Sequence, residues 1–148
     1  MRAGMRENVG MPGGGNSVRD GAGRSVLIVE DSENSAATLE IAFLGIPGVS
    51  VRLASSAMEA LRLLNNGDGF QAIVTDLNMP RMDGFELIDR VRHDRRWSAV
   101  PIIVVSADTD PATPERIARL GVSAFFAKPY SPAQVRRKLE QILDGTTQ

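Results

Sequence analysis

The sequence contains no cysteine. This absence excludes disulfide bonds, thiolate metal sites and a cysteine nucleophile, so any chemistry must come from oxygen and nitrogen groups. The sequence also has no apolar run approaching the roughly 20 residues that a membrane-spanning helix needs, and its N-terminus lacks the apolar segment of a secretory signal. We therefore expect a soluble protein without membrane partners and, in the absence of disulfides, a cytoplasmic location.

An excess of charge of one sign is also missing. The 17 Lys and Arg residues nearly balance the 18 Asp and Glu residues among 148 positions. No global field would then attract the chain to nucleic acid or to an anionic membrane, and we expect neither as a partner. The length suits one domain with a substantial core and is short for two.

Both ends of the chain differ in composition from the middle. Residues 1–24 are rich in Gly, Arg, Asn and Ser and have scarcely any large apolar side chain. Such a segment cannot bury enough surface to offset the entropy lost on ordering, so it is predicted to be a disordered tail. Residues 144–148 are predicted to be a short C-terminal tail, which leaves no room for a second, DNA-binding domain.

From Ser25 onward, short apolar runs alternate with longer segments of helical periodicity. This pattern is typical of a parallel sheet covered on both faces, which places the chain in the α/β class. We expect one domain over residues 25–143, built from five strand–helix units with right-handed crossovers. The predicted strands are Val26–Val29, Val49–Leu53, Ala72–Thr75, Ile102–Val105 and Ala124–Phe126.

Helix starts are marked by capping residues. Three pairs fit the capping box, in which the first side chain accepts a hydrogen bond from the third helical amide and the second side chain reaches back. These pairs are Ser56 with Glu59, Asp83 with Glu86, and Ser131 with Gln134. Pro114 and Pro132 are predicted at first helical positions. The run of Arg90, Arg92, Arg95 and Arg96 around His93 is interpreted as a solvated, charged helix end, and Trp97 is left unassigned.

Polar residues follow the predicted strands, at the edge where ligands of open α/β sheets gather. They are Glu30 and Asp31, Asp76, Ser106 and Ala107, and Lys128 and Pro129. Neighbouring carboxylates repel one another unless a cation neutralises them, and a set of hard oxygen ligands favours Mg²⁺. Asp76 could then attack a phosphoryl group, with Mg²⁺ and Lys128 neutralising charge and Ser106 donating a hydrogen bond.

These residues, together with Asn78-Met79-Pro80 and Asp83-Gly84 after Asp76, resemble the response-regulator receiver family of two-component signalling. The resemblance extends over about Ser25 to Leu143. It implies a doubly wound, flavodoxin-like (βα)5 fold with a central five-stranded parallel sheet in the order 2-1-3-4-5. It also implies a single-domain regulator that turns over no outside substrate and is therefore not an enzyme in the usual sense.

The resemblance further implies the role of each site residue. Asp76 would accept the phosphoryl group from a sensor histidine kinase or a histidine phosphotransfer protein. Mg²⁺ would be held by Asp31, Asp76 and the backbone carbonyl of Asn78, with Glu30 assisting from outside the coordination shell. Lys128 would pair with the phosphoryl group.

Two of the implied residues would carry the signal away from the acceptor. Ser106 would move toward the phosphoryl group and Phe125 would be the aromatic switch. A downstream protein would bind the face made by the last two helices and the fifth strand. Many family members have Tyr where this chain has Phe125, which lacks the hydroxyl that could hold the switched rotamer.

Three other functions compete with this interpretation. An aspartyl-nucleophile hydrolase would need a second acid two residues after the nucleophile, where Asn78 cannot transfer a proton. A flavodoxin-like cofactor binder would place a phosphate after the first strand, where Glu30 and Asp31 would repel it. A receiver-like protein-interaction module that works without phosphorylation remains an open alternative.

Overall fold

The computed structural model describes residues 24–67 and 69–145. The predicted disordered tail lies outside these residues, apart from Arg24, whose guanidinium pairs with Asp144. The order of elements is β1 (Ser25–Val29), α1 (Glu33–Phe43), β2 (Ser50–Ala54), α2 (Ala57–Asn65), β3 (Ala72–Thr75), α3 (Gly84–Arg92), β4 (Ile102–Ser106), α4 (Thr113–Arg119), β5 (Ala124–Ala127) and α5 (Pro132–Leu143).

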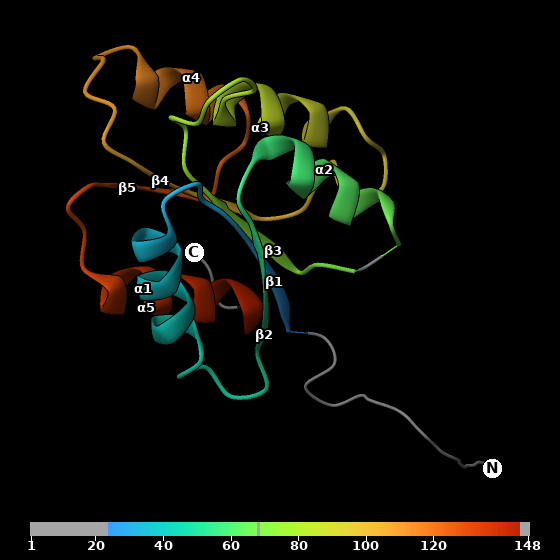
Figure 1. The fold of residues 1–148 in the computed structure, drawn as a ribbon, viewed down its shortest axis with the longest axis vertical. Coiled ribbons are helices and arrows are strands. Elements are labelled where there is room, and N and C mark those ends of the chain that lie inside the picture. Colours follow the sequence, from blue (N-terminus) through green and yellow to red (C-terminus); the bar gives the residue numbers. More distant parts are fainter. Residues whose placement is uncertain (1–23, 68, 146–148) are drawn as a thin grey trace.

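The five strands form one parallel sheet in the order β2-β1-β3-β4-β5, which confirms the predicted topology. Helices α1 and α5 cover one face of the sheet, and α2, α3 and α4 cover the other (Figure 1). Alternate side chains of each strand therefore enter two separate cores. Leu27 and Val29 of β1 pack toward α2 and α3, whereas Val26 and Ile28 pack toward α1 and α5.

Strand β3 matches the prediction most closely, and β1, β4 and β5 are each one residue longer than predicted. Every residue of β3 is buried, and its bounds are those predicted. Strand β2 lies at the edge of the sheet and begins one residue later than predicted, because the Val49 N–H donates to Ile46 in the turn after α1. It also ends one residue later, since the Ala54 carbonyl accepts a ladder bond from the N–H of Glu30.

The three predicted N-caps are confirmed. Ser56, Asp83 and Ser131 each accept from the amide three residues on, at 3.0–3.2 Å. The reverse half of the capping box differs from the prediction. The Glu59 carboxylate accepts from the N–H of Ser55, one residue before the cap, and Glu86 pairs with Arg90 one turn along α3.

Helix α4 begins differently from the prediction. It starts at Thr113, so Pro114 occupies its second position, and its N-cap residue Ala112 has no side chain that could accept a hydrogen bond. Within its seven residues, Thr113 and Ile117 are buried. Helix α4 is therefore held by little apolar burial and by no side-chain cap.

Arg92, the last residue of α3, is not part of a solvated helix end, and that interpretation was wrong for this residue. Its guanidinium donates to five backbone carbonyls, at 2.7–3.4 Å. These belong to Trp97, Ser98, Val100, Leu120 and Gly121. Arg92 thus joins the C-terminal ends of α3 and α4 to the loop that enters β4.

Trp97, in the same loop, packs against the core beneath α2 and α3, with its ring centroid 6.4 Å from that of Phe70. Among the described residues, no helix is long and apolar enough to cross a membrane.

Candidate functional site

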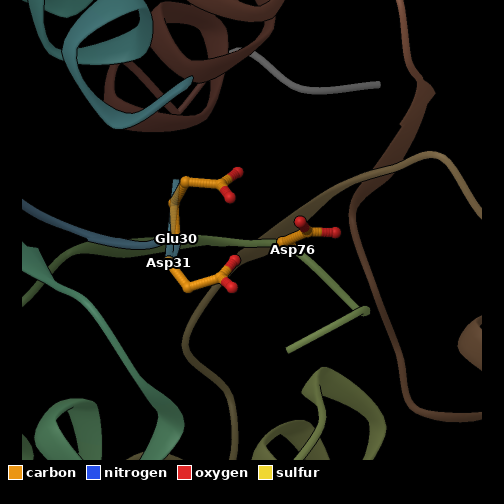
Figure 2. A group of neighbouring side chains, drawn as sticks. All are labelled: Glu30, Asp31 and Asp76. Atoms are coloured by element: carbon orange, nitrogen blue, oxygen red, sulfur yellow. The ribbon is translucent and has the colours of Figure 1, made fainter. Parts of the chain in front are cut away.

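Three carboxylates meet at the C-terminal ends of the parallel strands, where β1 and β3 lie side by side. Glu30 and Asp31 follow β1, and Asp76 follows β3. One oxygen from each carboxylate lies within 4.8 Å of the other two, and Figure 2 shows the three groups around a common space. Glu30 and Asp76 are buried, whereas Asp31 is open to solvent. The convergence of the three acids agrees with the expectation from the sequence.

The carboxylate of Asp76 is held at both oxygens. Its Oδ1 accepts from the N–H of Leu77 at 2.7 Å and from the N–H of Asn78 at 3.2 Å. Its Oδ2 accepts from Lys128 Nζ at 3.1 Å. Because Oδ1 accepts from two amides and Oδ2 accepts from Lys128 alone, Oδ2 retains more lone-pair capacity for a further bond.

Lys128 reaches this cluster from the end of β5, across the end of β4. Its Nζ also lies 3.1 Å from Glu30 Oε1, so one ammonium bridges two buried carboxylates. Burial alone would lower the pKa of Lys128, but hydrogen bonds and charge from Asp76 and Glu30 outweigh burial and raise it. The lysine therefore stays charged at neutral pH.

For Glu30, burial affects the pKa more than hydrogen bonds or neighbouring charges do. It raises the pKa of this carboxyl, with help from the negative charge of Asp76 and against the opposing bonds from the Ser32 N–H and from Lys128. The Ser32 N–H lies 3.2 Å from Glu30 Oε2. The Glu30 carboxylate thus accepts hydrogen bonds from Lys128 and from the residue that caps α1. Of Glu30 and Asp31, only Asp31 is accessible to solvent.

Ser106, the last residue of β4, is fully buried beside the cluster. Its Oγ accepts from the N–H of Asp108 at 3.0 Å and from the side-chain amide of Asn78 at 3.3 Å. Asn78 was predicted to contribute to the site through its backbone carbonyl only. The contact between its side chain and Ser106 was not predicted, although Asn78 follows β3 and Ser106 ends the adjacent parallel strand β4.

Phe125 lies away from the carboxylates. It is half-buried on β5 and packs against the core on the α2–α3–α4 side of the sheet, while Phe126 packs against the opposite core. Its ring lines a shallow hollow with Pro114 and Ile117 of α4. Phe125 therefore faces α4, the helix that begins a few residues after Ser106.

The oxygen-rich cluster fits a small divalent cation. The group of metal-ligating side chains that the structure describes around Asp76 consists of three carboxylates without a histidine, and one of them, Asp31, is accessible from water. Mg²⁺ prefers such hard ligands, takes one or two carboxylates and keeps several waters. The residues present are thus chemically suited to Mg²⁺.

Comparisons with known proteins agree with the fold. The model of the response regulator receiver domain family matches residues 26–140. A chemotaxis protein CheY homolog of Campylobacter jejuni is 30% identical over 118 residues, which are 80% of this chain and 91% of the relative.

Solved structures give the same result. A response regulator receiver protein from Pseudomonas putida aligns with a TM-score of 0.74 and 30% identity, over 80% of this chain and 96% of the other. The chemotaxis response regulator CheY4 of Vibrio cholerae aligns with a TM-score of 0.70 and 28% identity, over 80% and 98%.

The chain therefore belongs to the response regulator receiver domain family. Such domains serve two-component signalling and do not turn over an outside substrate. This assignment favours the receiver interpretation over the hydrolase and the flavodoxin-like cofactor binder.

Proposed function

We propose that this chain is a response regulator that accepts a phosphoryl group on Asp76 and passes the signal to a partner protein by a change of shape. The observation that carries the proposal is the setting of Asp76. Its carboxylate is buried, oriented by two amides, and bound to Lys128 within a cluster of acids. The phosphoryl donor would be a sensor histidine kinase or a histidine phosphotransfer protein.

In the proposed reaction, Asp76 Oδ2 attacks phosphorus and the bond from phosphorus to the donor's imidazole nitrogen breaks. The product is an acyl phosphate, and the nitrogen keeps the electron pair of the broken bond. Lys128 Nζ, already beside Oδ2, would then neutralise a phosphoryl oxygen. Phosphoryl transfer of this kind depends mainly on positioning and on charge neutralisation.

Asp31, Asp76 and the backbone carbonyl of Asn78 would hold Mg²⁺. When bound, the ion would neutralise charge on the acceptor and on the incoming phosphoryl group. Glu30 would assist without binding the metal directly, because its carboxylate orients Lys128. Asp31 is exposed and is therefore free to turn toward a hydrated ion.

We propose that Ser106 and Phe125 carry the signal outward. The buried Ser106 hydroxyl would donate to a phosphoryl oxygen on Asp76, and its movement would shift the loop that leads to α4. Phe125 would then take up a different position between β5 and α4. The downstream partner would bind the face formed by α4, β5 and α5. The cytoplasmic location expected from the sequence stays a prediction.

Intact-protein mass spectrometry after incubation with acetyl phosphate tests the proposal directly. We expect a Mg²⁺-dependent gain of one phosphoryl mass in the wild type and no gain in Asp76→Asn, which keeps the shape of the side chain. Asp89→Asn, on the exposed surface of α3, is the matched control and should gain the same mass as the wild type.

A different result would identify the alternative function. If the folded wild type binds Mg²⁺ and gains no mass, phosphorylation on Asp76 is wrong. The phosphorylation-independent interaction module would then be the better description.

A further inference from the structure

Helix α4 is connected to α3 by a contact between a cation and an aromatic ring. The guanidinium carbon of Arg116 lies 3.7 Å from the centroid of the Phe85 ring. Arg116 is exposed, whereas Phe85 is buried. Arg92 holds the C-terminal end of α4, but the helix has only two buried residues and no side-chain cap, so the contact between Arg116 and Phe85 adds to what holds it in place.

The Phe85 end of this contact is fixed to the backbone of the acceptor residue. Phe85 follows Gly84, which packs against the main chain of Asp76 and donates from its N–H to the Leu77 carbonyl at 2.9 Å. The backbone that carries the ring therefore cannot move far without displacing the turn that carries Asp76.

The start of α4 is connected to Ser106 by three successive hydrogen bonds. The Asp108 N–H donates to Ser106 Oγ at 3.0 Å, and the Asp110 N–H donates to Asp108 Oδ1 at 2.8 Å. The Ala112 N–H then donates to Asp110 Oδ1 at 2.9 Å. A shift of Ser106 would therefore be passed along this loop to the first turn of α4.

We propose that the Phe85–Arg116 contact is a latch that holds α4 in its resting position and opposes phosphorylation of Asp76. The proposal rests on the function proposed above. When Ser106 turns toward a phosphoryl oxygen, the loop draws on the N-terminal end of α4, while Phe85 stays with Asp76. A contact made only in the resting state disfavours the phosphorylated state by its own free energy. Phe85 and Arg116 are thus positioning residues for the phosphorylation reaction.

Breaking the latch should make Asp76 easier to phosphorylate. We expect Arg116→Ala and Phe85→Leu each to raise the initial rate of Mg²⁺-dependent phosphorylation by acetyl phosphate about two- to fivefold, the range that corresponds to an exposed cation–π contact. The double variant should show no more than the larger single effect, because both substitutions remove the same contact. Arg116→Lys, which keeps the cation, should restore most of the wild-type rate.

Arg119→Ala is the matched control. Arg119 lies on the same helix, is exposed, and pairs with Glu115 within α4. It should leave the phosphorylation rate unchanged. Equal rates in the wild type and Arg116→Ala would overturn the latch and leave the contact a purely structural role. A lower rate, or effects of the two single substitutions that multiply in the double variant, would overturn it as well.

Hydrogen exchange separates failure of the latch from failure of the proposed function. Without any phosphoryl donor, Arg116→Ala should speed amide exchange in residues 107–119 about two- to fivefold, and Arg119→Ala should not. If the wild type takes up no phosphoryl group, the proposed function is wrong, and this exchange measurement still decides whether the contact holds α4. Unchanged exchange in Arg116→Ala would overturn the latch.

Discussion

Gly84 packs against the main chain of Asp76 so closely that no side chain fits between them. A Cβ atom at position 84 would lie 2.2 Å from the Asp76 carbonyl oxygen and 2.7 Å from the Leu77 Cα. Both neighbours are backbone atoms, which cannot turn aside as a flexible side chain would. The first turn of α3 is therefore held directly against the turn that carries the proposed phosphoacceptor.

Gly84→Ala should destabilise the protein by about 3 kcal/mol, because α3 must move away from β3 to admit one methyl group. The same displacement should slow phosphorylation of Asp76. Urea unfolding followed by circular dichroism measures the first effect. Gly69→Ala is the control, since a Cβ at Gly69 would meet nothing within 4 Å, and it should change stability by less than about 0.5 kcal/mol.

Lys128→Met should increase the affinity for Mg²⁺. The ammonium of Lys128 neutralises Asp76 and Glu30 in the absence of metal, and it repels a cation placed beside them. Removing it should tighten Mg²⁺ binding about tenfold, as measured by titration calorimetry. Lys138→Met on α5 should have no effect. Unchanged affinity in Lys128→Met would show that Lys128 does not compete with the metal.

Arg92→Lys should cost about 3 kcal/mol of unfolding free energy. A lysine has three donors on a flexible stem and cannot serve the five carbonyls that the planar guanidinium reaches. Arg90→Lys, on the exposed face of α3 with a single ion pair to Glu86, should change stability by less than about 0.5 kcal/mol. Similar urea midpoints for the two variants would contradict the role given to Arg92.

Stability at acid pH should depend on Glu59. Hydrogen bonds from the Ser55 N–H and then from the Ser55 hydroxyl lower the pKa of this carboxyl below its ordinary value of 4.5. A carboxylate with a lowered pKa stabilises the folded state at higher pH and loses that contribution as the pH falls through its folded pKa. The wild type should therefore exceed Glu59→Gln in stability near neutral pH.

The stability difference between these two proteins should shrink below about pH 4.5. Thermal unfolding of both proteins from neutral to acid pH measures it. A difference that stays constant across this range would show that the charge of Glu59 contributes nothing.

The sequence was sufficient for those features that depend on local order along the chain. Each of Glu30, Asp76 and Lys128 directly follows a strand, and parallel strands bring their carboxyl ends to one edge, so their convergence could be predicted. Strand β3 was predicted with its bounds because it is a short apolar run buried on both faces. N-caps were found for the same reason, since the cap and its partner lie three residues apart.

Features that depend on distant backbone atoms could not be predicted. Arg92 stands in a run of arginines, and nothing in that run separates it from Arg90. Its carbonyl partners at Leu120 and Gly121 lie almost 30 positions away and become neighbours only when α3 and α4 pack together. The hydrogen bond between Asn78 and Ser106 could not be predicted either, because it depends on a side-chain rotamer and not on the spacing of residues in the sequence.

The position of Trp97 determines what its fluorescence will report. It is the single tryptophan of the chain. It lies in the loop that enters β4, at the N-terminal ends of the strands, whereas Asp76 lies at their C-terminal ends. Its emission should change sharply when the core around Phe70 unfolds, and only slightly when Mg²⁺ or a phosphoryl group binds at the carboxyl edge. Intrinsic fluorescence is thus a clean probe of global unfolding in this protein, and optical detection of phosphorylation will need a second fluorophore placed beside α4.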